Sequence, residues 1–130
     1  MQTRCNTLKN MFPIFKKSAE ENIEKIDFEP ILTNLIDLLY QNSNIEQAEW
    51  VEEIKSALLT NDLDSFKNKL ISVDMWGGSG AVWEVGGFKS ESDHRKLISE
   101  LIKLTDLMKK SGLKSKAAQS RGNLLKRIKA

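Results

Sequence analysis

A glycine-rich stretch, residues 76–87, holds the residue types best suited to recognition chemistry in this 130-residue chain. It contains five of the seven glycines and two of the three tryptophans. Consecutive glycines permit backbone conformations with positive φ and let another chain approach closely. Three interpretations follow: a tight reversal that serves only geometry, a loop whose free N–H groups bind an anion such as phosphate, and an exposed recognition patch.

Nucleotide-binding motifs fit this stretch poorly. A P-loop has a lysine after its last glycine, whereas alanine follows Gly80, and no strand–glycine–helix context for a dinucleotide is present. Tryptophan is typical of protein-binding hot spots, because its large ring is desolvated at little rotamer cost. The recognition patch would consist of Trp76, Gly77, Gly78, Gly80, Trp83 and Glu84. The purely geometric interpretation stays open beside it.

Catalytic and metal-binding residues are scarce. His94 is the only histidine and lies among charged residues near the start of an expected helix, where a surface role is the simplest one. Cys5 is the only cysteine, so it forms no internal disulfide, which fits a reducing compartment. One Cys, one His and no calcium-loop spacing do not make a metal site. We expect no enzyme activity, no cofactor and no metal. Without a secretory signal or an apolar run of about 20 residues, we expect a cytoplasmic protein.

Charge is segregated along the chain although the formal net charge is only +2. Residues 1–19 carry four basic groups and no acidic group, residues 20–64 carry twelve acidic groups against two basic ones, and residues 109–130 carry eight basic groups and no acidic group. Such blocks bear on partners and long-range fields more than on fold. Either the basic end folds back onto the acidic helices, or each block meets a partner of opposite charge.

Apolar residues recur at helical spacing on both sides of the glycine-rich stretch, so we expect an all-α domain of about five helices. The expected helices cover 14–26, 30–42 (the central core helix, opened by Pro30), 45–59, 63–73 and 92–111. Asn44 and Gln47 have the spacing of a capping box, and Asn61 or Asp62 caps the helix that follows. Ser90 or Ser92 caps the helix over 92–111, and Gly112 ends it. The glycine-rich stretch is a loop or, alternatively, a short β-hairpin over 73–85. Residues 1–112 form the helical domain, and 113–130 form a basic helix or a tail.

The run from Trp76 to Glu84 resembles the loop of an uncharacterised family of small bacterial helical proteins, which has the form Gly-Gly-x-Gly-Ser-x-Asn-Asp. Gly77, Gly78 and Gly80 match this form, while Ala81, Trp83 and Glu84 stand at its serine, asparagine and aspartate. Some proteins of this size and type look like immunity proteins, which neutralise a toxin by binding it. The resemblance therefore implies a bacterial binding protein.

We expect a non-catalytic protein-binding module, an immunity-type inhibitor of a basic toxin or an adaptor. It would use the loop together with an exposed acidic helical face made by Glu46, Glu49, Glu52 and Glu53, of which Glu46, Glu49 and Glu53 are the expected partner contacts. Opposite charges would speed its association with a basic partner. The alternative is a nucleic-acid-associated accessory protein that binds through the basic segment 109–129, although that segment has no aromatic residue for base stacking.

Overall fold

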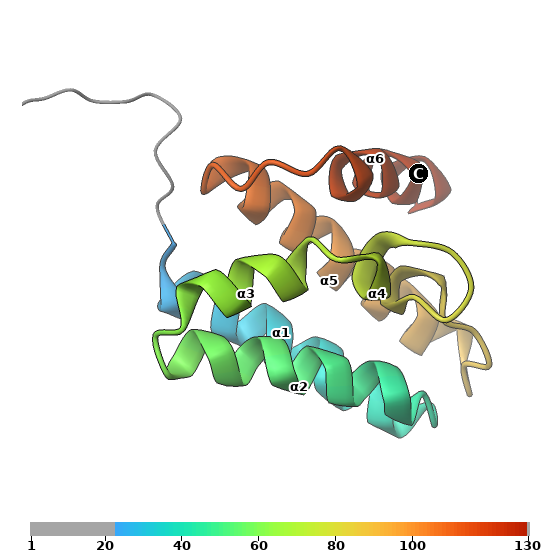
Figure 1. Ribbon diagram of the computed structural model, residues 1–130. Helices are drawn as coiled ribbons and strands as arrows, with labels where there is room; N and C mark the ends of the chain where they lie inside the picture. Colours follow the sequence, from blue (N-terminus) through green and yellow to red (C-terminus); the bar gives the residue numbers. More distant parts are fainter. Residues whose placement is uncertain (1–22, 130) are drawn as a thin grey trace, which may run out of the picture.

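The computed structural model describes residues 23–129, which form helices joined by short turns and one long loop (Figure 1). In chain order the elements are α1 (Lys25–Gln41), α2 (Ile45–Leu59), α3 (Leu63–Leu70), α4 (Val73–Trp76), the 3-10 helix η2 (Val82–Glu84), α5 (Glu91–Lys110) and α6 (Lys116–Lys129). No β-strand occurs in this part of the chain. The expected all-α class is confirmed for it, and none of its helices has the length and hydropathy needed to cross a bilayer.

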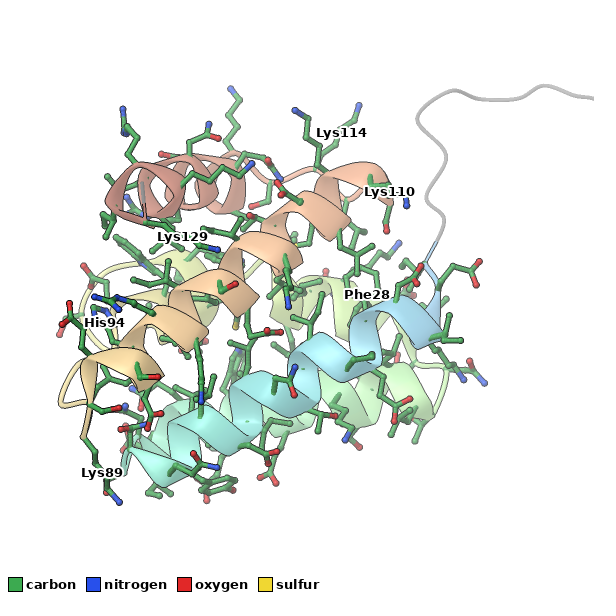
Figure 2. The ribbon with its side chains drawn as sticks, turned by 180° about the vertical axis from the view of Figure 1, so that it is seen from behind. Phe28, Lys89, His94, Lys110, Lys114 and Lys129 are labelled. Atoms are coloured by element: carbon green, nitrogen blue, oxygen red, sulfur yellow. The ribbon has the colours of Figure 1, made fainter. Side chains whose placement is uncertain are left out.

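The helices are layered around α5. One side of α5 packs against α1, which pairs with α2, and α6 packs against another side of α5. Both views place α6 at one edge of the molecule and the α1–α2 pair at the opposite edge (Figures 1 and 2). The core between these layers is apolar, and Phe28 of α1 meets Phe66 of α3 edge to face, with ring centroids 5.3 Å apart. Since α1 and α2 carry most of the acidic block and α6 carries most of the basic residues of 109–129, these two blocks lie at opposite edges of the described part of the chain.

The first described helix begins earlier than Pro30, where the sequence placed its start. α1 starts at Lys25 and contains Pro30 in its second turn. Proline has no N–H to donate to the carbonyl four residues back, here that of Ile26. Ile26 is 78 % exposed, so the missing hydrogen bond lies at the exposed start of α1 and not in the core. Most of the helix expected over 14–26 lies outside the described residues.

Three helix ends follow the chemistry expected from the sequence. Asp62 caps α3 by accepting the backbone N–H of Ser65, and Ser90 caps α5 by accepting that of Asp93. Gly112 ends α5 with a φ of +82°, which glycine adopts without a side-chain clash. α3 itself stops at Leu70, three residues before the expected end, because a turn at 71–72 separates it from α4.

The proposed hairpin over 73–85 does not form. Residues 73–76 make the single helical turn α4, and Val82–Glu84 make the 3-10 turn η2. In place of cross-strand pairing, the backbone N–H of Gly77 bonds to the carbonyl of Val73, and that of Ala81 bonds to the carbonyl of Gly78. Local turns thus satisfy these backbone groups.

The C-terminal segment forms a helix over Lys116–Lys129, which decides between helix and tail for these residues. Leu113, Ala118 and Leu125 are buried in the core that α6 shares with α5. Gly122 is also buried, and a Cβ at this position would lie 2.9 Å from the Cβ of Thr105 on α5. The glycine that weakens the intrinsic helix propensity of α6 is therefore what lets α6 approach α5 closely.

A buried amide ties the far end of α1 to the start of α5. The side chain of Asn42 is only 3 % exposed. Its Nδ2 donates to the carbonyl of Leu38 and to Oδ2 of Asp93, and its Oδ1 accepts the backbone N–H of Lys89 at 2.7 Å. These bonds fix the place where the chain leaves the glycine-rich loop and enters α5.

Candidate functional site

The tryptophans of the glycine-rich loop brace its inner side. Trp76 is 1 % exposed, and its indole N–H donates to the carbonyl of Leu70 at 2.7 Å. Trp83 is half-buried, and its indole N–H donates to the carbonyl of Gly77 at 2.6 Å. Each indole closes a six-residue span of backbone, so the two rings hold α4 and η2 in place.

Arg121 of α6 fastens the same loop from outside. Its Nε donates to the carbonyl of Trp76 at 3.1 Å, and its guanidinium carbon lies 4.5 Å from the ring centroid of Trp83. A guanidinium over an indole face is attracted by the ring quadrupole. Nothing in the sequence indicated this contact, because 45 residues separate Arg121 from Trp76.

The first turn of α2 fastens the loop from the opposite side. Asn44 is the residue before α2, but its side chain caps nothing; its Nδ2 donates to the carbonyl of Gly86 at 3.2 Å. Gln47 donates in the same way to the carbonyl of Gly80 at 2.9 Å. The capping-box interpretation of this pair is therefore wrong. Two amides at the correct spacing reach a distant loop whose carbonyls need donors.

These contacts change the proposed recognition patch. Trp76 is enclosed and cannot contact a partner, which contradicts its assignment as an exposed anchor. Gly77 is confined as well, because a Cβ there would lie 2.6 Å from the carbonyl oxygen of Val73. Gly78, Gly80 and Glu84 are exposed and form the outer edge of the loop. The loop is thus a joint between α2 and α6 with a small polar rim.

The acidic residues assigned to α2 share one exposed side of that helix. Glu46, Glu49 and Glu53 are all exposed. Glu53 pairs with Lys69 of α3, whose Nζ lies 3.1 Å from a carboxylate oxygen of Glu53 and 4.7 Å from the ring centroid of Trp50. Since Gln47 bonds to Gly80, the start of this acidic side lies beside the rim of the loop. The two parts of the predicted site are therefore neighbours.

A tyrosine–carboxylate bond joins α1 to α2 near this face. The hydroxyl of Tyr40 donates to Oε1 of Glu52 at 2.6 Å. This bond, with partial desolvation and the negative charges of Glu52 and Glu49, raises the pKa of Tyr40 from 10.0 to about 12. A phenolate would face these carboxylates directly, so the neutral phenol is favoured.

A groove of about 550 Å³ runs along the exposed seam between α1 and α2. Its wall on α1 is formed by Thr33, Ile36 and Asp37. Its wall on α2 and in the turn after it is formed by Glu52, Lys55, Ser56, Leu59 and Thr60. The sequence did not indicate this groove, because it exists only once the two helices are paired.

The opposite edge of the molecule is basic. Lys126 pairs with Asp106 of α5 at 2.7 Å. Lys110, at the end of α5, and Lys114, in the turn that follows, lie near this edge (Figure 2). A hollow of about 420 Å³ at this turn is lined by residues that include Lys109, Lys114 and Lys116. Among the described residues, the hydrogen bonds that α6 makes with other segments and its ion pair with Asp106 go to α5, to Trp76 and to the turn before α6, and none goes to the acidic helices α1 and α2.

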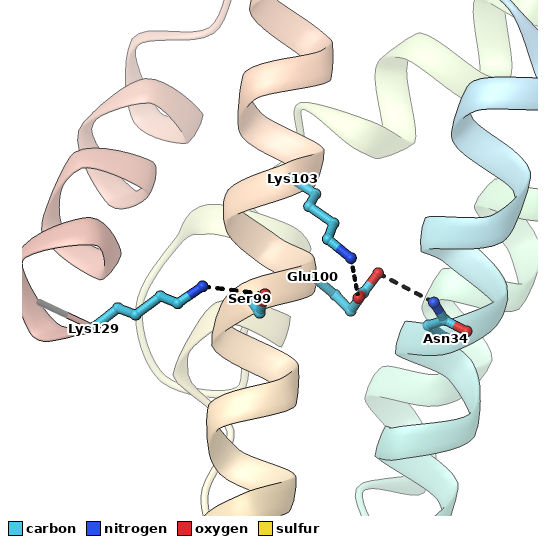
Figure 3. A network of polar contacts seen from close by, with 5 residues as sticks. All are labelled: Asn34, Ser99, Glu100, Lys103 and Lys129. Atoms are coloured by element: carbon cyan, nitrogen blue, oxygen red, sulfur yellow. Dashed lines mark hydrogen bonds and ion pairs between the residues drawn. The ribbon is translucent and has the colours of Figure 1, made fainter.

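Glu100 is the most buried carboxylate of the described residues, and its surroundings make it a structural tie (Figure 3). One of its oxygens accepts from Nδ2 of Asn34 at 3.3 Å, and the other lies 3.0 Å from Nζ of Lys103. Both oxygens are engaged, and the acceptance from Asn34 links α5 to α1. Nearby, Nζ of Lys129 donates to Oγ of Ser99 at 3.4 Å, which fastens the end of α6 to α5.

His94 is exposed and stacks on Phe88, with ring centroids 4.7 Å apart (Figure 2). It lines a hollow of about 360 Å³ whose other residues include Glu91, Arg95 and Lys129. No hydrogen bond or ion pair joins the imidazole of His94 to the charged groups of Glu91, Arg95 or Lys129. In residues 23–129, no group of three or more His, Cys, Asp and Glu side chains is arranged to hold a metal ion. Cys5 lies outside the described residues.

No protein-family model, characterised protein or solved structure was found to match this chain.

Proposed function

We propose that this protein is a non-catalytic binding module that holds a basic protein partner against the acidic side of α2. The observation that supports this proposal is the exposure of Glu46, Glu49 and Glu53 on one side of α2, far from the basic edge formed by α6. Glu53 has the cation Lys69 beside it, whereas no ion pair joins Glu46 or Glu49 to another described residue. Their charge therefore acts on whatever approaches this face.

Electrostatics gives such a face a kinetic role. An exposed block of charges of one sign accelerates the encounter with a partner of the opposite sign. Salt weakens this attraction, because charges more than about 10 Å apart are largely screened at 0.1 M ionic strength. The polar rim of the loop (Gly78, Gly80 and Glu84) lies next to this face and adds contact area. The buried ring of Trp76 takes no part.

An immunity-type inhibitor is the form of this function that we favour. Its target would be a basic toxin, such as a nuclease that carries cationic groups to hold nucleic acid. The resemblance of the run from Trp76 to Glu84 to small bacterial helical proteins supports the same class. A gene for a toxin-like protein beside the gene for this chain would identify the partner. We expect that partner to be basic on the surface that contacts the acidic side of α2.

The test uses the full chain as bait, together with two variants of equal net charge. E46K/E49K reverses two charges on the proposed face, and D64K/D74K reverses two charges at exposed positions elsewhere. The partner that the unaltered chain captures is identified by mass spectrometry, purified, and mixed with each form in stopped flow. We expect the association rate to fall steeply with salt, and to fall more for E46K/E49K than for D64K/D74K. A salt-independent rate would exclude electrostatic steering.

Nucleic-acid binding through α6 is the second candidate, and one observation favours it. Exposed cations gather where α5 meets α6 and along α6, with no acidic residue between 109 and 129. They are Lys109, Lys110, Lys114, Lys116, Lys126, Arg127 and Lys129. Fluorescence anisotropy with a labelled DNA duplex tests it directly. The K110E/K114E variant should weaken binding strongly while E46K/E49K should not weaken it, because phosphate neutralisation depends on the number of cations in contact.

A further inference from the structure

The groove between α1 and α2 has a chemistry that goes beyond a charged face. Ile36 lies on its α1 wall and is 8 % exposed, whereas Leu59 lies on its α2 wall and is 45 % exposed. The carboxylates of Asp37 and Glu52 line it from the two helices, and Lys55 is its one lining cation. An apolar strip with acidic groups on both sides is complementary to a helix that carries leucine-like residues on one face and lysine or arginine beside them.

The groove continues as a stripe along α1. Ile26, Glu29, Thr33, Ile36 and Tyr40 recur three or four residues apart, so they share one side of the helix. Ile26 is 78 % exposed and Tyr40 is 38 % exposed, which extends the apolar strip beyond both ends of the hollow. From Ile26 to Tyr40 the helix rises about 21 Å, the length of a helical segment of about 14 residues.

The Tyr40–Glu52 bond defines one end of this docking surface. Because α1 and α2 run antiparallel, Tyr40 lies one turn beyond Asp37 while Glu52 lies one turn before Ser56. The bond therefore crosses the groove and leaves it open toward Leu59 and Thr60. A helix laid into the groove would pass its cations over Asp37 and Glu52 and seat its apolar residues against Ile36 and Leu59.

We propose that the α1–α2 groove binds a basic amphipathic helix presented by the protein partner. This inference rests on the proposed function and specifies it, since it names the element of the partner that is recognised. Charge complementarity selects that occupant, because two carboxylates, those of Asp37 and Glu52, line the groove against one cation, Lys55, while α6 lies at the far edge of the molecule.

The experiment uses two synthetic peptides of equal length with the full chain, one built from Leu and Lys at helical spacing and one from Leu and Glu. Binding is measured by calorimetry and mapped by backbone amide shifts. We expect the Leu/Lys peptide to bind and to shift amides around Ile36 and Leu59, and the Leu/Glu peptide not to bind.

Two variants with the same change in charge separate the groove from the general acidic field. D37K/E52K reverses the groove, whereas E46K/E49K reverses the outer side of α2. We expect D37K/E52K to weaken peptide binding about tenfold or more and E46K/E49K about threefold or less, because contact pairs outweigh screened distant charges. L59S should also weaken peptide binding although Asp37 and Glu52 are both still present. Because Leu59 is exposed, this change should leave the fold intact.

Each other outcome overturns the inference in a recognisable way. If both double variants weaken peptide binding equally, the general acidic field and not the groove binds the peptide. The proposed function would then stand, and the groove would not be the binding site. Absence of binding by either peptide would remove the groove as a helix site, while the salt test above still judges the proposed function. Self-association that D37K/E52K abolishes would make a second copy the occupant. If the groove amides shift in the K16E/K17E variant without any peptide, the occupant of the groove is the N-terminal segment of this chain and not a partner helix.

Discussion

Replacing Gly122 with alanine sets two opposing effects against each other within α6. Alanine in a helix interior is favoured over glycine by about 1 kcal/mol, so propensity alone predicts a more stable protein. The added Cβ, however, would lie 2.9 Å from the Cβ of Thr105 and closer still to its hydroxyl oxygen. Real Cβ atoms do not approach so closely, so α5 and α6 must separate.

The steric effect outweighs the propensity gain. The hydroxyl of Thr105 can rotate away only by giving up its bond to the carbonyl of Ile102, 3.0 Å away, a loss of about 1 kcal/mol. The Cβ of Thr105 cannot rotate away, because the backbone of α5 fixes it. Overpacking of a buried contact costs about 1–3 kcal/mol. We expect G122A to lower the free energy of unfolding by about 1–3 kcal/mol after the propensity gain is subtracted.

Equilibrium urea unfolding measures this change, and S120A is the matched control. Ser120 is exposed on the same helix, so its replacement gains helix propensity without a clash and should stabilise the protein by about 0.5 kcal/mol. Combining G122A with T105G moves the small residue to the other helix and should recover about 1 kcal/mol or more in a double-mutant cycle. A G122A variant as stable as S120A would refute the close packing of α5 and α6.

Three further changes test other parts of the structure. Tyr40 is the only tyrosine, so its near-ultraviolet absorbance should titrate in a single step near pH 12. Folding raises the pKa of Tyr40 and so favours its neutral form. The resulting contribution to stability is present below pH 10 and is lost as the pH rises from 10 toward 12. In E52Q the midpoint should move back toward 10 because the main cause of the shift is removed; an unchanged midpoint would contradict the bond. G80A should lower the free energy of unfolding by about 1–2 kcal/mol because the φ of Gly80 is +88°, whereas G78A, with open space and no positive φ, should be nearly neutral by the same urea assay. R121M should shift the tryptophan emission and lower the melting temperature, because it removes both the bond to the loop and the cation over the indole; unchanged emission would show that Arg121 does not hold the loop.

Local chemistry explains which sequence-based predictions about the fold were correct. The caps at Asp62 and Ser90 and the stop at Gly112 depend on side chains and φ angles within a few residues, and the structure confirms all three. The Asn44–Gln47 prediction failed because an amide satisfies a distant carbonyl as readily as a nearby N–H. Spacing alone cannot distinguish the two.

The candidate site was predictable in its charges and not in its geometry. The exposed side of α2 follows from helical spacing, so Glu46 and Glu49 lie where the sequence placed them. The burial of Trp76 depends on the carbonyl of Leu70, and an indole of this kind suits a core and a binding surface equally well. The sequence could not decide between them.

By itself, the sequence determined the all-α class, the bounds of α2, the ends of helices at Asp62, Ser90 and Gly112, and the separation of charge along the chain, because these depend on residues close together in sequence. Only the tertiary structure decided that the basic and acidic blocks occupy opposite edges, that Arg121 and Gln47 fasten the loop, and that α1 and α2 enclose a groove. Those features depend on which helix pairs with which. Pairing is set by the summed burial of many side chains, and no short stretch of sequence contains that sum.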